Sequence, residues 1–290
     1  MRRRVATSDK AGGTARVRSV VWHVGVLLLL AVVLYPIVWV LAATFKPSED
    51  IVGSLRLLPS EVTTANYDRV FEGVVGVGIG RFFLNSAVLA VLSVVGTVAS
   101  SALAAYAFGR LRFRGRTVMF GIMISTLLLP FHVLIIPQYI VFQNLDLVDT
   151  YVPLLAGKFL ASEAFFIFLI VQFIRNLPRE LDESAKIDGA NHWRVFWDII
   201  LPLCRPALIT TAIFTFIWSW NDFFGPLIYL STPDKYPLPL ALQLFIDETS
   251  GSDFGALMAM SMLALVPVIL FFLFFQRFLV EGVSTQGLKG

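Results

Sequence analysis

Long runs without charged side chains alternate with short charged segments along the chain. Four such runs occupy residues 19–45, 82–109, 117–145 and 254–276, and they hold 27, 28, 29 and 23 residues. A transmembrane helix needs about 20 mainly apolar residues, because it rises about 1.5 Å per residue through a hydrocarbon core about 30 Å thick. Each run therefore predicts one transmembrane helix.

Two further apolar segments carry polar residues within them. The segment 152–173 contains Lys158 and Glu163, and the segment 207–230 contains Asn221 and Asp222. Both segments are long enough to cross a bilayer. The sequence therefore predicts an all-α polytopic membrane protein with six transmembrane helices, over about 20–43, 82–108, 118–139, 152–173, 207–230 and 255–276.

The first apolar run follows a basic start, which is also typical of a cleaved signal peptide. Its length exceeds the apolar core of about 7–15 residues that such peptides contain. We interpret it as a retained helix. The predicted organisation is a tail over residues 1–18 followed by a membrane domain over residues 19–290.

The distribution of lysine and arginine predicts how the helices are oriented. Seventeen of these residues lie before the first span, between spans two and three, between spans four and five, or after span six. The opposite loops hold five, and Lys158 lies within a span. Because basic loops stay on the cytoplasmic side, both termini are predicted to be cytoplasmic.

The composition agrees with a membrane protein. Hydrophobic residues make up 57% of the chain and charged residues 15%, against about 45–50% and about 25% in soluble domains. A disordered chain, a disulfide scaffold and an ordinary soluble enzyme are thereby excluded. The single cysteine, Cys204, cannot form an internal disulfide. The net charge of +3 reflects the basic loops, so it indicates topology and predicts no binding to nucleic acid.

One connecting segment, residues 176–206, has a pattern of its own. Pro178 suits a first helical turn, and the acidic residues that follow favour a helix start through the helix dipole. Gly189 predicts a helix stop or a tight bend. After it, apolar residues recur at the spacing of one helix face: Trp193, Phe196, Trp197 and Ile200. The pattern predicts two short helices joined by a bend, and an amphipathic connector without further function has the same composition.

The order of residues within this segment distinguishes the two interpretations. The string Glu183-Ser184-Ala185-Lys186-Ile187-Asp188-Gly189-Ala190, followed by Ile200-Leu201-Pro202, resembles the EAA loop of ABC-transporter permease subunits. In that family the loop forms a coupling helix that docks in a cleft of the cytoplasmic ATPase subunit. The departure is Ser184, a small residue where the family has alanine. The resemblance implies that ATPase coupling is carried by Glu183, Ser184, Ala185, Asp188, Gly189, Ala190, Trp193 and Phe196.

Further blocks resemble one branch of that superfamily. The blocks 212–223, 226–230 and 236–239 are similar to the fifth span and outer loop of carbohydrate permeases of the maltose-permease type, and 276–282 and 287–290 are similar to their ending. The resemblance implies the type I importer fold in a bacterial-type cell membrane. It also implies a cargo that is an oligosaccharide or a related polyol or glycerol phosphate.

The resemblance also implies partners. These are two ATPase subunits, a second homologous six-helix permease and an extracytoplasmic solute-binding protein, in addition to membrane lipid. The sequence contains no GxxxxGK[ST] phosphate loop, so this chain is not expected to hydrolyse ATP or to bind a cofactor. ATP and magnesium would belong to the partner ATPase.

Polar residues within the spans are candidates for the substrate pathway, because they are costly in lipid. Trp218, Trp220, Asn221 and Asp222 combine aromatic faces with hydrogen-bonding groups, which suits a sugar, and an interfacial aromatic belt with a packing asparagine fits equally. Glu163 is a further candidate for the pathway or for packing in the bundle. Lys158 lies five residues before it, so the pair is expected on different helix faces without direct contact.

Three other features have simpler interpretations. The glycine-rich stretch 73–80 lacks the lysine of a phosphate cradle and is predicted to be a surface loop. His132 lies between two prolines, Pro130 and Pro137, and favours a kinked packing helix over a proton relay. The small residues of span two, among them Gly96 and Ser100, predict close helix packing.

A different class of protein remains as the alternative, namely a stand-alone secondary transporter or channel. Such a protein would be expected to show a coupling-ion site, a pore ring or internal repeats. The sequence shows no clear repeat. Nor does it contain the paired aspartates or the HExxH motif of an intramembrane enzyme.

Overall fold

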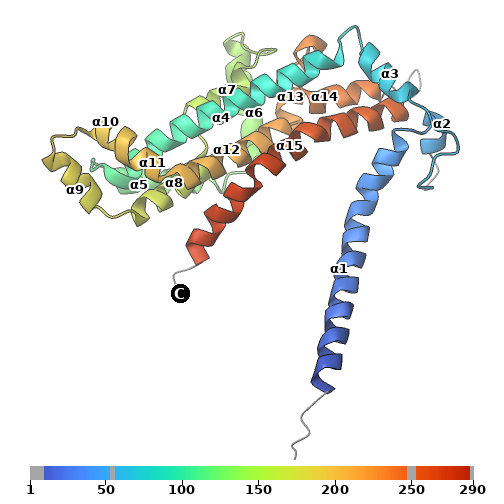
Figure 1. The fold of residues 1–290 in the computed structure, drawn as a ribbon. Helices are drawn as coiled ribbons and strands as arrows, with labels where there is room; N and C mark the ends of the chain where they lie inside the picture. Colours follow the sequence, from blue (N-terminus) through green and yellow to red (C-terminus); the bar gives the residue numbers. More distant parts are fainter. Residues whose placement is uncertain (1–9, 53–55, 247–252, 288–290) are drawn as a thin grey trace, which may run out of the picture.

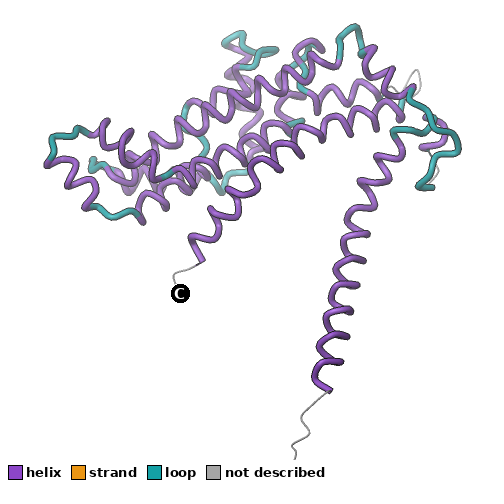
Figure 2. The backbone as a smooth tube through the Cα atoms, viewed as in Figure 1, coloured by secondary structure: helices purple, strands orange, loops and turns teal. Residues whose placement is uncertain are grey.

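The computed structural model describes residues 10–52, 56–246 and 253–287, and in these residues helices and loops make up the fold without a named strand (Figure 2). Four helices are the longest, namely α1 (Lys10–Ala43), α4 (Ile79–Arg110), α12 (Arg205–Trp220) and α15 (Phe254–Gly287). The last three belong to the body of the bundle.

Shorter helices complete the bundle and its ends. Near the start of α4 lie α2 (Ser48–Ile51) and α3 (Ala65–Glu72). Four more follow α4, namely α5 (Arg116–Thr126), α6 (Phe131–Asn144), α7 (Val152–Phe159) and α8 (Ala164–Asn176). The segment before α12 contains α9 (Glu180–Ile187), α10 (His192–Arg194), a π-helix (Val195–Ile200) and α11 (Leu201–Leu203), and α12 is followed by α13 (Phe224–Tyr229) and α14 (Leu238–Ala241).

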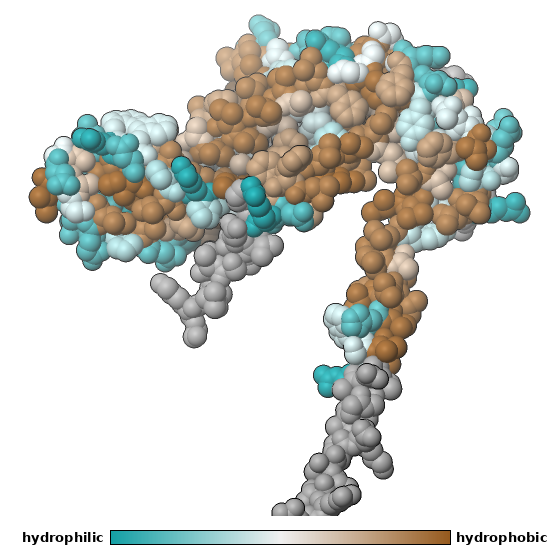
Figure 3. All heavy atoms as spheres, in the orientation of Figure 1, coloured by the Kyte–Doolittle hydropathy of each residue, from teal (hydrophilic) through white to brown (hydrophobic). Residues whose placement is uncertain are grey.

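Four segments of the described chain are long and apolar enough to cross a membrane. They are Arg18–Ala43, Ile79–Arg110, Val152–Asn176 and Phe254–Arg277, which match predicted spans one, two, four and six. Apolar side chains cover the middle of the bundle and most of α1, and polar side chains gather at the ends (Figure 3). Helix α1 leaves the bundle beside α2 and projects away from it (Figure 1).

Predicted spans three, four and five are not continuous helices. The prediction of one helix over 118–139 is wrong, because α5 ends at Thr126 and α6 begins at Phe131. Pro130 has an extended backbone conformation, and proline disfavours the helical conformation in the residue before it. Residues 160–163 likewise separate α7 from α8, and α12 ends at Trp220, before α13.

The sequence prediction also differs from the structure at both ends. Residues 10–18, predicted as tail, already belong to α1. Residues 1–9, with the arginines that start the chain, lie outside the described residues. The same holds for residues 288–290 and for the side chains of 278–287, which include most of the predicted family ending.

Helix α4 is the centre of the bundle and packs against α7, α8 and α12. Close approach depends on small residues, as predicted for this span. A Cβ added to Gly96 would lie 2.8 Å from the Phe159 ring of α7, and one added to Gly109 would lie 2.7 Å from Cγ2 of Ile174 in α8. Both glycines are therefore required by the packing of their neighbours.

Hydrogen bonds and an ion pair connect the first turns of α4 with the loops at the same end of the bundle. Asn85 of α4 donates to the backbone oxygens of Asp234 and Tyr236, at 2.8 and 2.9 Å. The carboxylate of Asp149 pairs with Lys235 at 2.7 Å. Although desolvation raises the pKa of Asp149, hydrogen bonds from Lys235, Thr232 and Ser231 outweigh it and hold that pKa well below the usual range. Hydrogen bonds and an ion pair thus join three segments that are distant in sequence: the start of α4, the loop before α7 and the loop after α13.

The glycine-rich stretch 73–80 forms a tight turn before α4. Val74 and Val77 exchange backbone hydrogen bonds at 3.0 Å, and the two residues between them, Val75 and Gly76, have φ angles of 52° and 75°. This is the geometry of a two-residue turn. The stretch is therefore a connection at the surface, as predicted.

The role of Gly109 is testable by adding a single methyl group. We expect Gly109→Ala to destabilise the protein by about 1–3 kcal/mol, because its methyl group would overlap Ile174. Gly121→Ala in α5 is the matched control, since nothing lies within 4 Å of its added Cβ. Thermal unfolding in detergent measures both, and equal stability of the two variants would contradict this account of the packing.

Candidate functional site

The predicted coupling segment folds as a helix, a bend and a second helical segment. Helix α9 begins at Glu180, and its first turn carries three acidic residues, as expected at the positive end of a helix dipole. It ends in a Schellman motif, in which Ala190 N–H donates to Ala185 O at 2.9 Å and Gly189 N–H donates to Lys186 O at 3.0 Å. Gly189 has a φ of +81°, so the predicted bend is confirmed, and its left-handed backbone favours glycine.

The second half of the segment differs from the predicted regular helix. Asn191 begins it by accepting a hydrogen bond from Arg194 N–H at 2.9 Å, an N-cap that the sequence signals by an asparagine before the helix. Residues Val195–Ile200 then form a π-helix, a feature frequent at functional sites.

The predicted apolar stripe divides in two at this π-helix. Phe196 and Ile200 are buried, whereas Trp193 and Trp197 are 61% and 57% exposed. The four residues therefore do not share the single helix face that their spacing predicted. The buried pair attaches the segment to the bundle, and the exposed pair stays available to a partner.

Residues predicted for ATPase coupling likewise separate by exposure. Ala185 and Phe196 are buried in a core cluster shared with α4 and α8, and Ala190 packs against that cluster. Exposed positions are occupied by Glu183, Ser184, Asp188, Gly189 and Trp193. The segment thus has an inner side that anchors it and an outer side formed by the bend and the acidic helix.

The anchor is an ion pair that the sequence did not reveal. Arg110, the last residue of α4, pairs with Asp182 of α9 at 3.2 Å, and their side chains are 4% and 13% exposed. Arg110 also donates to the backbone oxygen of Leu177 at 3.0 Å. One turn earlier, the hydroxyl of Tyr106 donates to His192 O at 3.1 Å. The end of α4 therefore holds both halves of the segment.

A second candidate site lies within the bundle, beside the breaks that interrupt two predicted spans. A cavity of about 370 Å³ is lined by residues that include Ser93, Lys158, Glu163, Trp218 and Asp222. An adjoining cavity of about 480 Å³ shares Lys158, Glu163 and Asp222. The structure thus brings together three of the five predicted pathway residues, namely Glu163, Trp218 and Asp222.

The expectation that Lys158 and Glu163 do not pair is wrong. Lys158 Nζ lies 2.5 Å from Glu163 Oε1. The expectation assumed one regular helix, but α7 ends at Phe159 and α8 begins at Ala164. The break between them lets two residues five apart face each other, and both line the cavities.

The other two predicted pathway residues lie elsewhere. Trp220 is buried against α15, where its Nε1–H donates to Ala264 O at 3.2 Å and its ring contacts Phe83 and Phe216. Asn221 is exposed and donates to Ile217 O at 2.8 Å at the end of α12. Packing and helix capping account for these two residues. The side chain of His132 lies outside the described residues.

Comparison with known proteins agrees with this architecture. Residues 96–285 match the family described as binding-protein-dependent transport system inner membrane component. The chain is 31% identical to a diacetylchitobiose uptake system permease protein of Streptomyces coelicolor, covering 94% of this chain and 90% of that protein. It is 30% identical to an arabinooligosaccharides transport system permease protein of Halalkalibacterium halodurans, covering 96% and 99%.

A solved structure has the same fold. It is a bacterial ABC transporter involved in the import of the acidic polysaccharide alginate, with a TM-score of 0.79 and 24% identity over 94% of this chain and 99% of that one. The family match covers more than half of the chain. This chain therefore belongs to the inner membrane components of binding-protein-dependent transport systems, and it is a multi-pass membrane protein.

The ion pair between α4 and α9 yields a test of the anchor. We expect Arg110→Met to destabilise the packing of α9 by about 3 kcal/mol, because it leaves Asp182 without its partner in a largely buried position. This destabilisation is measured by hydrogen exchange, in which the α9 amides of the variant should exchange faster than those of the wild type. The double variant Arg110→Met/Asp182→Leu is expected to recover part of the protection, because no charge is then left unpaired.

The matched control is the exposed pair of Arg194 and Asp198, whose side chains are 71% and 63% exposed. Arg194→Met is expected to change stability by at most about 0.5 kcal/mol, since exposed pairs contribute little. If Arg110→Met left exchange in α9 as slow as Arg194→Met does, the anchor assigned to the buried pair would be wrong.

Proposed function

We propose that this chain is the permease subunit of an ATP-driven importer that moves a carbohydrate delivered by an extracytoplasmic binding protein. The observation that carries the proposal is the exposed bend of α9 and Gly189, fixed to the bundle core by α4. A docking segment must offer an outer surface to its partner and transmit displacement inward, and this segment has both properties.

The proposed topology has six membrane crossings with both termini in the cytoplasm. Four crossings correspond to the long apolar segments, of which Val152–Asn176 is interrupted between α7 and α8. The other two would be made by interrupted helices, α5 with α6 and α12 with α13. The basic residues of the 111–116 turn and of the α9–α11 segment would then lie on the cytoplasmic side, as the positive-inside rule favours.

The mechanism follows from how the coupling segment is attached. Closure of a pair of ATPase subunits would move α9, and the Arg110–Asp182 pair would transmit that displacement to the end of α4. Because α4 packs against α7, α8 and α12, its movement would change the walls of the cavities. Such a rearrangement between two packed states is the usual form of alternating access. ATP and magnesium would be bound by the partner ATPase.

The two cavities suit a hydroxyl-rich cargo. Non-helical backbone at membrane depth is tolerated where it lines a cavity or is buried in protein, and the breaks at 160–163 and 221–223 both adjoin these cavities. Carboxylates, a lysine and a serine offer hydrogen bonds to hydroxyl groups, and the Trp218 ring offers an apolar face. The sugar transporters among the relatives support a carbohydrate as cargo.

A second, similar permease subunit is part of the proposal. The apolar stretch of α1 contains no buried residue, and α1 contacts the bundle chiefly through α15, near one end (Figure 1). Helix α1 therefore leaves enough exposed apolar surface to contact both lipid and a neighbouring subunit. We therefore place this chain in an assembly with a homologous six-helix partner and two ATPase subunits.

The bend at Gly189 provides a test of coupling with a closely matched control. Gly189 and Gly76 both have a positive φ, of 81° and 75°, and open space around an added Cβ. Valine at either position is expected to cost about 1–3 kcal/mol of backbone strain. We expect Gly189→Val to uncouple ATP hydrolysis from sugar uptake by at least about tenfold, whereas Gly76→Val should leave the ratio unchanged.

Uptake and ATP hydrolysis are to be measured together in proteoliposomes that contain the whole transporter. Gly189→Asn should retain more coupling than Gly189→Val, because asparagine tolerates the left-handed conformation better. Equal uncoupling by the two valine variants would attribute the effect to general destabilisation and contradict the coupling role of the bend.

Two neighbouring residues test the pathway. Asp222 lines both cavities, whereas Asn221 lines neither and caps α12. We expect Asp222→Ala to lower sugar uptake at least about tenfold, through the loss of a charge-assisted hydrogen bond to the cargo, without preventing assembly. Asn221→Ala should affect uptake less than about twofold.

Uptake of radiolabelled sugar and recovery of the assembled complex are the two measurements. Unchanged uptake by Asp222→Ala would remove Asp222 from the pathway. Uptake that persists without any ATPase subunit would instead favour the alternative of a secondary transporter or channel.

A further inference from the structure

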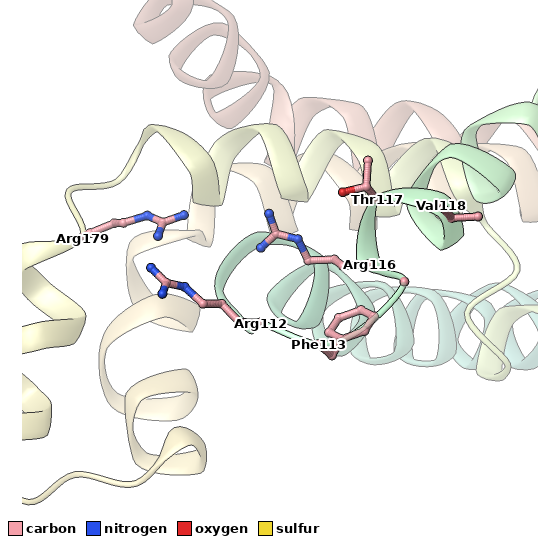
Figure 4. A pocket seen from close by; sticks show the side chains of 7 residues that line it. Arg112, Phe113, Arg116, Thr117, Val118 and Arg179 are labelled. Carbon is pink, nitrogen blue, oxygen red and sulfur yellow. The ribbon is translucent and has the colours of Figure 1, made fainter.

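A basic pocket lies beside the coupling segment and has no role in the proposed coupling. Its volume is about 510 Å³. Arg112 and Arg116 come from the turn between α4 and α5, and Arg179 comes from the residue before α9. Figure 4 shows that the three guanidinium groups extend toward one shared space from two separate segments.

The charge of this pocket is not balanced by its own walls. The remaining lining residues are Phe113, Gly115, Thr117 and Val118, none of which is acidic. Within the described part of the chain, no ion pair joins Arg112, Arg116 or Arg179 to a carboxylate. Asp182 and Glu183 line an adjoining cavity shared with Arg112 and Arg179, and Asp182 is already paired with Arg110. Three like charges repel one another across a shared space, so an anion bound among them would be favoured.

The turn between α4 and α5 holds positive groups in place for an anion. Arg116 Nη1 donates to Leu111 O at 3.1 Å, which fixes one edge of the guanidinium group and leaves other donors for a ligand. The first turn of α5 also lines the pocket, and α5 runs for 11 residues. Its N-terminal end adds the positive end of a helix dipole to the three arginines. Planar guanidinium groups match the oxygens of a phosphate.

The surface beside the pocket indicates the source of that phosphate. Val118 lines the pocket and is 66% exposed, and Ile122, one turn further along α5, is 61% exposed. In the proposed topology α5 lies in the membrane, where exposed apolar side chains of this kind would face acyl chains. A free phosphate would use the arginines alone, whereas a phospholipid would use both the arginines and this apolar helix face.

We propose that Arg112, Arg116 and Arg179 bind the phosphate of an anionic phospholipid in the cytoplasmic leaflet. The proposal rests on the cytoplasmic orientation in the proposed function, because the cytoplasmic leaflet carries the anionic lipids that attract basic segments. The lipid bridges two segments: Arg179 directly precedes α9, and the other two arginines follow α4. A bound headgroup therefore reinforces the attachment of the coupling segment to the bundle.

The first test counts bound lipid by native mass spectrometry of the whole transporter, after purification from nanodiscs that contain phosphatidylcholine and phosphatidylglycerol. The wild type is expected to retain phosphatidylglycerol. The triple variant Arg112→Gln/Arg116→Gln/Arg179→Gln should retain at least about tenfold less, given the loss of three headgroup contacts. The matched control, Arg114→Gln/Arg194→Gln/Arg205→Gln, removes the same charge from residues that do not line the pocket.

The second test addresses the bridge. Amides of α9 should exchange more slowly in nanodiscs with phosphatidylglycerol than in phosphatidylcholine alone, and Arg179→Gln should abolish that difference. This single variant keeps the proposal testable if the triple variant does not assemble. Hydrogen exchange and lipid retention are read on the protein itself, so they remain informative even if the chain fails to transport a sugar.

Three results would overturn the proposal. Equal retention of phosphatidylglycerol by both triple variants would show that the pocket does not bind it. Displacement of the lipid by millimolar inorganic phosphate, with equal slowing of α9 exchange by phosphate alone, would assign the site to a soluble anion. Loss of the ATPase subunit from the pocket variant with full lipid retention would assign the arginines to protein docking.

Discussion

The ion pair between Arg110 and Asp182 determines how one end of the bundle is built. A charge shielded from water is costly without its partner, and here Arg110 also donates hydrogen bonds to the backbone oxygens of Leu177 and Pro178. Around this pair lie the buried residues of the coupling segment, such as Ala185 and Phe196. The exposed bend at Gly189 can present a surface to a partner because its opposite side is fixed in this way.

The helix breaks inside the bundle obey a similar constraint, because their unpaired backbone groups also need partners. In lipid every backbone group needs an internal partner, so a broken helix is stable where the break faces protein or a cavity. The breaks at 160–163 and 221–223 adjoin the same two cavities. They place the ion pair of Lys158 and Glu163 beside Asp222, and all three residues line both cavities. The positions of these two helix breaks are thus explained by the cavities that they adjoin rather than by helix propensity.

Hydropathy alone predicted the helical class and the long spans, because membrane thickness fixes helix length. The bend at Gly189 was also predictable, since a residue with positive φ at a helix end favours glycine. The break at Pro130 was missed, although proline gave a local signal. The pairing of Arg110 with Asp182 had no signal, because 72 positions separate them and a single sequence contains no record of contacts. Trp220 and Asn221 were placed in the pathway by type, but helix phase and capping direct them elsewhere.

Docking of the α9 bend on an ATPase subunit is the central claim, and a site-specific crosslink tests it most directly. Ser184 is exposed and the single native thiol, Cys204, is buried, so a benzophenone attached to Ser184→Cys would label one defined position. In the assembled transporter this probe should crosslink to the nucleotide-hydrolysing subunit, and the same probe at the exposed Ser60, near α2, should not. Failure of the Ser184 probe to reach that subunit in a complex that still transports sugar would contradict the account.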